Sequence, residues 1–222
     1  MVITDDNFAT IVAAIEEGRR VFDNIKKAII YLLSSNLGEV LTVFIASLFM
    51  LPLPLTAAQI LWVNFLSDGF PALALGMDPV APRIMMRKPN ASKGEVLTPT
   101  ITLAIIRTGF LIGICCLFLY MFFLQTHDLI KAQTVVFTAL VMSEFLILQT
   151  VRQNYGQTLF ANKYVTLSFA VVLILQLTLI YSPLNQLFRL SPLDLEDWIA
   201  ISLTVGALFV FNHFVHKFFK NE

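Results

Sequence analysis

The feature that most constrains this chain is a series of six apolar segments, each about as long as a membrane-crossing helix. A helix needs ~20 mostly apolar residues to cross the hydrocarbon core. Hydrophobic residues make up 57% of the 222 residues and charged residues 14%, whereas soluble domains average ~25% charged. The sequence therefore predicts an all-α polytopic membrane protein, with six transmembrane helices bundled in a lipid bilayer. The predicted spans are Ala28–Leu51, Ala57–Met77, Ile101–Leu124, Ala132–Val151, Tyr164–Ser182 and Trp198–His216.

The distribution of Lys and Arg predicts the orientation of these spans. Twelve of the fifteen basic residues fall outside the spans on one predicted side of the bundle, and only Lys131 and Arg189 fall on the other. Because loops on the cytoplasmic side carry an excess of Lys and Arg, the side with twelve is predicted to be cytoplasmic. Both termini then lie in the cytoplasm, with residues 217–222 as a short tail. The formal net charge of zero gives no indication of a nucleic-acid partner.

Residues 1–27 differ from the rest of the chain, because they combine helical spacing with many charges. Residues 4–7 offer helix-capping side chains, and apolar residues then recur with the period of a helix. These residues are Phe8, Ile11, Val12, Ile15 and Phe22. The pattern predicts an amphipathic stalk helix that leads into the first span and needs a soluble domain against which to pack. On this interpretation the chain is a piece of a longer protein.

A carboxylate lies near the middle of the second predicted span. Asn64, Ser67 and Asp68 are spaced so that a helix places all three on one face. A carboxylate at this depth is costly in lipid, so it is expected to face the bundle interior, a partner or an ion path. Gly69 and Pro71 follow at once, and we expect a break there that frees backbone carbonyls as further ligands. The segment thus predicts an oxygen-rich cation site inside the membrane.

Two other spans carry carboxylates that could converge on the same site. Asn36 and Glu39 share a face of the first span, and Gly38 between them would allow close approach of a neighbouring helix. Glu144 lies in the middle of the fourth span. Calcium binds six to eight oxygen ligands from carboxylates, amides and backbone carbonyls. No His or Cys accompanies the group, which argues against zinc, copper or another soft metal.

Each of these polar residues also has a simpler interpretation. The hydroxyls of Ser34 and Ser35 are expected to bond back to carbonyls of their own helix, and Ser67 could do the same. Either asparagine could instead hold two helices together, and Glu144 could pair with a neighbour. Arg107 is interpreted as extending toward the membrane surface or pairing with another side chain, not as a ligand.

Three stretches of the sequence resemble the P-type cation ATPases, in particular the sarco/endoplasmic-reticulum-like calcium pumps. Thr4–Arg19 resembles the stretch where the phosphorylation domain of that family enters its stalk. Ser35–Val40 resembles the fifth transmembrane helix of the calcium-pump branch, and Leu61–Gly69 with Pro71–Gly76 resembles the sixth. The likeness covers essentially the whole chain and is stronger up to about residue 90. The six spans would then be the fifth to the tenth of the ten in that family.

The resemblance implies an ATP-driven cation pump that transports calcium, with manganese as the other candidate ion. By motif match, the implied cation ligands are Asn36, Glu39, Asn64, Ser67 and Asp68. Ser67 stands where the family usually has threonine. Glu144 aligns with the glutamate of the eighth helix that binds calcium in that group. Residues 1–27 would be the end of the phosphorylation domain and the stalk, and residues 28–216 the C-terminal membrane domain.

The chain departs from the family in what it lacks. The Asp-Lys-Thr-Gly phosphorylation motif, the nucleotide-binding domain and the first four helices are absent from this sequence. ATP and Mg²⁺ would act only in those missing domains, so the chain alone should not hydrolyse ATP, and the N-terminal portion of the pump is an expected partner. The alternatives are a free-standing six-helix subunit and a truncated, non-functional remnant. A secondary transporter is disfavoured because no inverted repeat is found, and a purely structural scaffold leaves the carboxylates unexplained.

Overall fold

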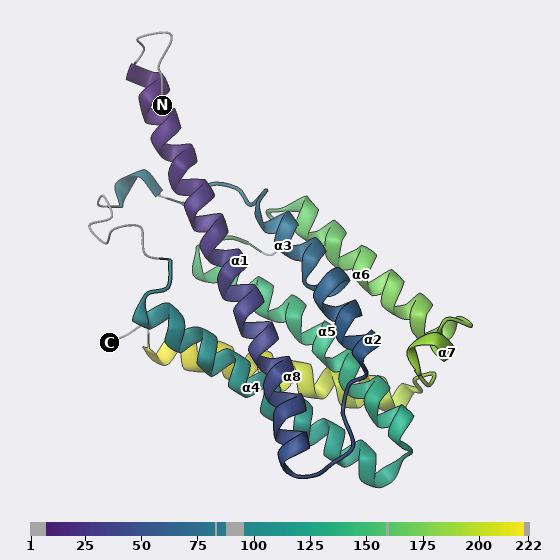
Figure 1. Cartoon of the computed structure of the whole chain (residues 1–222). Helices are drawn as coiled ribbons and strands as arrows, with labels where there is room; N and C mark the ends of the chain where they lie inside the picture. Colours follow the sequence, from purple (N-terminus) through teal and green to yellow (C-terminus); the bar gives the residue numbers. More distant parts are fainter. Residues whose placement is uncertain (1–7, 83, 88–95, 159, 220–222) are drawn as a thin grey trace.

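The computed structural model describes residues 8–82, 84–87, 96–158 and 160–219, without the side chains of 213–219. The described residues form helices and no strand (Figure 1). Within these residues, five helices are long and apolar enough to cross a membrane, which confirms the all-α polytopic membrane fold. The elements are α1 Phe8–Leu48, α2 Ala57–Trp62, η1 Val63–Ser67, α3 Gly69–Leu75, η2 Ile84–Met86, α4 Pro99–Thr126, α5 Leu129–Asn154, α6 Lys163–Tyr181, α7 Asn185–Phe188 and α8 Leu195–Phe219.

The predicted stalk and the first predicted span are one continuous helix. Helix α1 has 41 residues, which corresponds to ~60 Å at the rise of an α-helix, and its first turns project beyond the bundle (Figure 1). The side chains of Phe8 and Ile15 on this projecting part are 76% and 46% exposed. The apolar face of the stalk therefore remains uncovered within the described residues. The capping side chains predicted at residues 4–7 lie outside them.

The second predicted span is helical but interrupted, and the interruption is not where the sequence indicated. We expected the break at Gly69 and Pro71, whereas α3 begins at Gly69 and runs through Pro71. The wide turn is the π-helix η1 before it, in which the Asp68 N–H bonds to the Val63 carbonyl, five residues back, at 2.9 Å. Proline has no N–H for the carbonyl four residues earlier, so its effect falls on the preceding turn.

The remaining predicted spans agree with the observed helices to within a few residues at each end. Helices α4, α5 and α8 each extend beyond the predicted range at both ends, and α6 ends one residue early, at Tyr181. Side-chain caps fix three of the starts, and at α6 Asn162 accepts a hydrogen bond from the backbone of Tyr164. Thr98 accepts a hydrogen bond from the backbone of Ile101, and Asp128 accepts one from the backbone of Lys131. The short helix α7 was not predicted.

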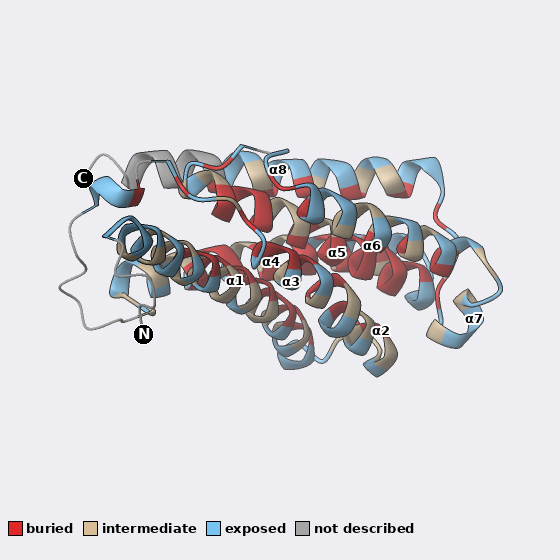
Figure 2. Ribbon diagram, turned by 90° about the horizontal axis from the view of Figure 1, so that it is seen from above, coloured by how far each residue is buried: buried red, intermediate tan, exposed pale blue. Residues whose placement is uncertain are grey.

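Helix α5 is the centre of the bundle, and most of its residues are buried (Figure 2). Helices α1, α4 and α8 pack around it. The approach of α1 to α4 depends on glycines, as expected at Gly38. A Cβ added at Gly38 would lie 2.8 Å from Ile112, and one added at Gly109 would lie 2.7 Å from Leu37. These glycines let α1 and α4 pack against each other at close range.

A buried ion network joins four elements at the stalk end of the bundle. Asp78, just beyond α3, accepts hydrogen bonds from Lys27 of α1 at 2.8 Å and from Arg152 of α5 at 3.0 Å. Asn162, which caps α6, donates to the same carboxylate at 2.9 Å, and Asn24 holds the backbone carbonyl of Asp78. The three charged side chains are fully buried. This network fixes the stalk end of α1 to the segment that follows α3.

Candidate cation-binding site

Three carboxylates from three different elements meet in the interior of the bundle. Glu39 comes from α1, Asp68 from the residue between η1 and α3, and Glu144 from the middle of α5. One oxygen of each lies within 4.8 Å of the others, and the three residues are 5%, 2% and 3% exposed. Ionised carboxylates this close repel one another strongly away from water, so the stable forms are those neutralised by a cation or by protons.

Helix α1 holds both oxygens of the Asp68 carboxylate. Ser35 Oγ donates a hydrogen bond to one oxygen at 3.0 Å, and Asn36 Nδ2 donates to the other at 3.2 Å. Ser35 Oγ also lies 3.1 Å from the carbonyl of Tyr31, as expected for a serine inside a helix, so its single proton is shared between that carbonyl and Asp68. The contact from Ser35 to Asp68 was not anticipated from the sequence. Adjacent residues on α1 thus set the position of the carboxylate on the neighbouring segment.

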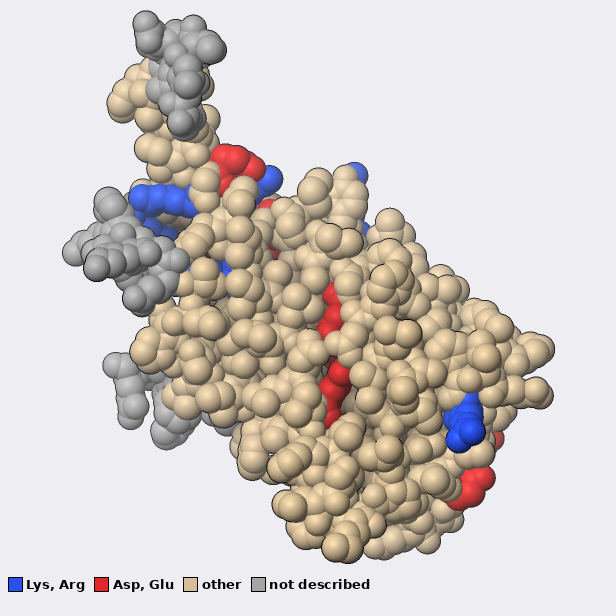
Figure 3. Space-filling view, in the orientation of Figure 1, with Lys and Arg blue, Asp and Glu red and all other residues tan. Residues whose placement is uncertain are grey.

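Asn64 and Glu39 form the side of the site nearest the surface. Asn64 Nδ2 donates to Glu39 Oε2 at 3.2 Å and to the carbonyl of Ile60 at 2.9 Å. Asn64 is exposed, and Glu39 lines a surface groove of about 370 Å³ together with Val40 and Phe44. Figure 3 shows acidic side chains as a narrow red stripe surrounded by uncharged atoms, while the other charged side chains on this face lie toward its upper and lower right ends. The site is therefore buried against α5, and its Glu39 side borders a groove between α1 and Ile60 of α2.

Ser67 contributes two oxygens with different surroundings. Its carbonyl would normally accept the N–H four residues on, but that residue is Pro71, which has none. Tyr31 of α1 donates its hydroxyl to this carbonyl at 3.0 Å instead. The expectation that freed carbonyls remain available as ligands is thus not met at Ser67. Its side-chain Oγ is buried and has no hydrogen-bond partner among the described residues.

Four buried oxygens without a hydrogen-bond partner belong to the predicted ligands. They are Glu39 Oε1, Ser67 Oγ, Glu144 Oε1 and Glu144 Oε2, each without a partner among the described residues. About nine in ten buried polar atoms in folded proteins are hydrogen-bonded. The interpretation of Glu144 as one half of a side-chain pair is therefore wrong for the described residues. The oxygens that lack partners are of the type that a hard cation binds.

The structure brings the predicted carboxylates together and shows which atoms of the two predicted asparagines face them. Glu39, Asp68 and Glu144 form the cluster, and Asn36 and Asn64 contact it through their amide nitrogens, so their amide oxygens are not the atoms engaged.

Outside the cluster, Ser34 Oγ does not bond back to its helix, contrary to expectation, and has no partner among the described residues. Arg107 pairs with Asn212 at 3.4 Å, in agreement with the interpretation that it pairs with another side chain.

Comparison with known proteins decides the family. Residues 52–219 match the family model described as "Cation transporting ATPase, C-terminus", and this range includes α2 to α8 with Asp68 and Glu144. The chain belongs to this family. The matched range is more than half of the chain, and α1, with Glu39, precedes it.

Relatives of known name extend the likeness to α1. The chain is 38% identical over 207 residues to a calcium-transporting ATPase of Bacillus subtilis, which covers 90% of this chain and 23% of the relative. It is 36% identical to calcium-transporting ATPase 1 of Bacillus cereus, over 89% of this chain and 25% of the relative. Calcium-transporting ATPase 1 of Saccharomyces cerevisiae is 30% identical over 95% of this chain and 23% of its own length. The chain thus spans about a quarter of these relatives.

Proposed function

We propose that this chain supplies most of the intramembrane ligands of an ATP-driven calcium pump. The observation that carries the proposal is the group of carboxylate and hydroxyl oxygens that are buried, close together and without partners. Their chemistry matches calcium, which binds carboxylate, amide and hydroxyl or carbonyl oxygens. The proposed ligands are Asn36, Glu39, Asn64, Ser67, Asp68 and Glu144, and the two asparagines would bind through their amide oxygens once the amide groups rotate away from the carboxylates. The printed names of the relatives support calcium as the transported ion.

The open side of the site supports a partner that completes it. Val40 and Phe44 on α1 and Phe65 on η1 are 61%, 60% and 74% exposed beside Glu39 and Asn64. Lipid would cover the apolar side chains but would leave the polar groups facing hydrocarbon, which is costly. We propose that helices from the N-terminal portion of the pump, in the same or a separate polypeptide, cover this face and add further ligands. ATP and Mg²⁺ would act in that portion.

Helix α1 provides a direct link from the stalk to the ligands. It runs without interruption from Phe8 to Leu48 and carries both Asn36 and Glu39. A pull on the stalk after phosphorylation would tilt α1 and move these ligands relative to Asn64 and Asp68. The conformation with the tilted α1 would have a lower affinity for the cation than the conformation before the tilt. The cation would therefore be released when the tilted conformation is favoured. Both termini lie in the cytoplasm under this proposal.

The first experiment measures the size of the native polypeptide and its calcium-dependent phosphorylation. An antibody raised against residues 218–222 should detect, in membranes of the source cells, either one large band or a 25.0 kDa band that co-purifies with a partner. In both cases radiolabelled ATP should label the polypeptide that carries the ATPase domains, and only with calcium present. A stable 25.0 kDa protein with no partner and no such labelling would overturn the proposal. The absence of any membrane-inserted product would identify a non-functional remnant.

A further inference from the structure

A second cavity lies away from the carboxylates, between helices α1, α4, α5 and α8 at the stalk end of the bundle. Its volume is about 790 Å³, within the ~300–1,000 Å³ typical of ligand sites. The start of α4, at Pro99, and the end of α5, at Asn154, both line it. Apolar side chains such as Ile30 and Leu103 form much of its wall. The cavity thus opens where the helices approach the stalk-side surface of the membrane.

Among the described residues that line this cavity, Arg107 carries the positive charge and none is acidic. Arg107 lies two turns into α4 and contacts Asn212 of α8 through a long hydrogen bond of 3.4 Å. Its Nε is buried and has no hydrogen-bond partner among the described residues. Side chains on a helix lean toward its N-terminus, so the guanidinium leans toward Pro99 and the mouth of the cavity. The positive end of the α4 dipole adds to the charge there.

Ser34 supplies a second polar atom that has no partner. It lies on α1, lines the same cavity and is 1% exposed, and its Oγ has no hydrogen-bond partner among the described residues. A buried hydroxyl without a partner costs about 1–3 kcal/mol relative to one that is hydrogen-bonded. Arg107 Nε can only donate, and Ser34 Oγ can donate as well as accept, so one acceptor group could satisfy both, and the positive charge favours an anion.

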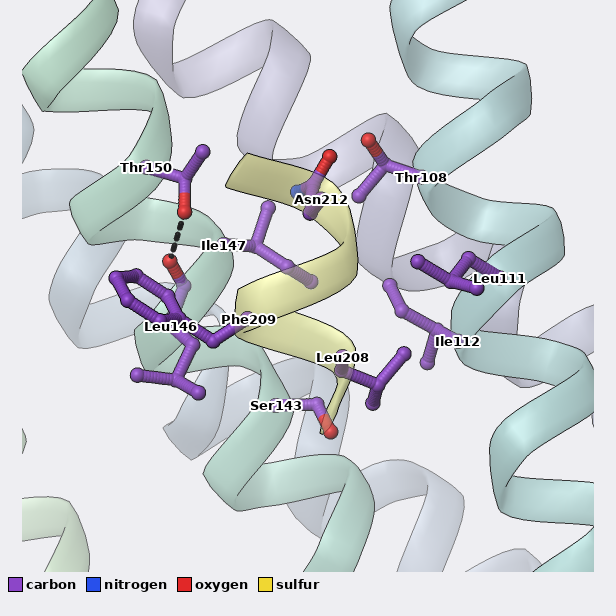
Figure 4. A pocket seen from close by; sticks show the side chains of 10 residues that line it. All are labelled: Thr108, Leu111, Ile112, Ser143, Leu146, Ile147, Thr150, Leu208, Phe209 and Asn212. Carbon is purple, nitrogen blue, oxygen red and sulfur yellow. Dashed lines mark hydrogen bonds between the residues drawn. The ribbon is translucent and has the colours of Figure 1, made fainter. Parts of the chain in front are cut away.

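The far end of the cavity is closed to anything larger than a water molecule. A smaller neighbouring cavity, of about 20 Å³, shares Thr108, Thr150 and Asn212 with the large one, and Figure 4 shows it in close-up. This volume is about that of one water molecule. Below it lie the apolar side chains of Ile112 and Leu208. A ligand that enters from the stalk side would therefore end at the level of Thr108.

We propose that this cavity binds an anionic phospholipid from the stalk-side leaflet of the membrane. The phosphate would contact Arg107 and Ser34 Oγ, and an acyl chain would lie along the apolar wall that includes Ile30 and Leu103. Basic pockets between transmembrane helices are known to take anionic lipid head groups. A zwitterionic lipid would neutralise the guanidinium less well. The proposal does not depend on calcium transport, because none of the six proposed cation ligands lines this cavity.

The test measures which lipids stay bound to the native protein. The protein is placed in nanodiscs of phosphatidylcholine with a minority of phosphatidylglycerol, and the retained lipids are counted by native mass spectrometry. The wild type should retain phosphatidylglycerol. Arg107→Gln should retain at least ~10-fold less, which corresponds to ~1.4 kcal/mol. The matched control Arg189→Gln, at an exposed residue next to α7, should behave as the wild type. Equal retention by the wild type and Arg107→Gln overturns the proposal.

A second variant separates binding in the cavity from attraction to the surface charge, and it remains informative if Arg107→Gln fails to fold. Ala104→Phe leaves Arg107 in place and fills the cavity, because Ala104 lines it. Phosphatidylglycerol should be lost from this variant as well. If Ala104→Phe retains the lipid, the lipid binds elsewhere and the proposal is wrong.

An assay with inorganic phosphate alone completes the test. Saturable phosphate binding at Arg107 without any retained phospholipid would assign the cavity to a soluble anion. The proposal that it binds a phospholipid would then be wrong.

Discussion

Two groups of buried charge lie in this bundle, and they differ in whether the chain itself supplies the opposite charge. Asp78 is surrounded by Lys27 and Arg152 at 2.8 and 3.0 Å. Asp68 lies instead near Glu39 and Glu144, with no Lys or Arg bonded to any of the three among the described residues. Both aspartates are at most 2% exposed. The first group therefore stabilises the fold as it stands, whereas the second requires neutralisation from outside the chain.

The two groups are also linked by the chain. Asp68 directly precedes α3 and Asp78 follows it, so one short helix connects the open site to the closed network. The closed network fixes the stalk end of α1 to this segment, while Ser35 and Asn36 contact Asp68 further along α1. We infer that the network acts as a fixed point about which the two ligand-bearing segments can move.

The largest expected effect on stability is that of Asp78→Asn. This substitution leaves Lys27 and Arg152 buried without their carboxylate, and loss of one partner of a buried ion pair costs about 3–5 kcal/mol. The free energy of unfolding of the purified protein in detergent should fall by that amount, and less protein should accumulate in the membrane. A loss below about 1 kcal/mol would mean that the network does not stabilise the fold.

The same chemical change at Asp68 should have the opposite outcome. Asp68→Asn removes one of three mutually repelling carboxylates, so stability without calcium should be unchanged or higher. Calcium affinity should fall by ~100-fold or more, equivalent to about 3 kcal/mol. Equilibrium binding of radioactive calcium to the native assembly, with manganese as competitor, measures the affinity. If this variant unfolds as readily as Asp78→Asn and still binds calcium, the contrast between the two groups is wrong.

A smaller effect is expected from Tyr31→Phe, which removes a hydroxyl beside Asp68 but leaves all three carboxylates in place. The variant loses the hydrogen bond to the Ser67 carbonyl, which Pro71 leaves without a helical partner. A net loss of ~1 kcal/mol in the free energy of unfolding is expected for one such bond. Thermal unfolding should detect it, with Tyr164→Phe as control, since that tyrosine is 43% exposed. Equal losses in both variants would show that the hydrogen bond has no particular role.

The smallest effect concerns an ion pair in contact with water at the opposite end of the bundle. Lys131 lies 2.8 Å from Asp194, whose side chain is 81% exposed. The hydrogen bond and the charge of Lys131 lower the pKa of Asp194 below its ordinary value. The pair therefore stabilises the fold above the ordinary aspartate pKa of ~3.9 and ceases to do so as the pH falls through the lowered value. Water screens the exposed Asp194, and Lys131 keeps the buried Asp197 at 2.6 Å as a second partner, so the effect of Asp194 alone is small.

Thermal unfolding of the wild type and Asp194→Asn from pH 7 to pH 3 checks this prediction. The small difference between them at pH 7 should disappear at the acid end. A difference that persists unchanged at pH 3 would mean that the pair is not its cause.

The sequence predicted the membrane fold and most of the candidate site for the same reason. Long apolar segments and helical spacing are local patterns, so they indicate both the spans and the face shared by Asn64 and Asp68. The network around Asp78 was not predicted. Lys27 and Arg152 were interpreted only as charges near the cytoplasmic surface, but tertiary packing buries both. Their partners are 51 and 74 residues away in sequence, a separation at which no local pattern indicates a contact.

The turn in the second span shows a similar limit. Pro71 predicted an interruption, but its position depended on which carbonyl lost its partner. That carbonyl is the one of Ser67, and it bonds to Tyr31, which lies 36 residues before Ser67. Ser34 and Ser35 are neighbours of the same type, and only Ser35 bonds back to the helix. The residues packed opposite each hydroxyl decide whether it bonds back to its own helix. The sequence of α1 alone does not show which residues these are.

The central claim is that the three buried carboxylates bind the transported cation, and Glu144 tests it most directly because both of its oxygens lack partners among the described residues. The native protein, purified through its C-terminal tail, is measured for bound calcium as the wild type, as Glu144→Gln and as the control Glu196→Gln. Glu196 is an exposed residue of α8. The account predicts that the wild type and Glu196→Gln bind calcium equally and that Glu144→Gln loses at least ~100-fold in affinity. Unchanged calcium binding by a folded Glu144→Gln protein would contradict it.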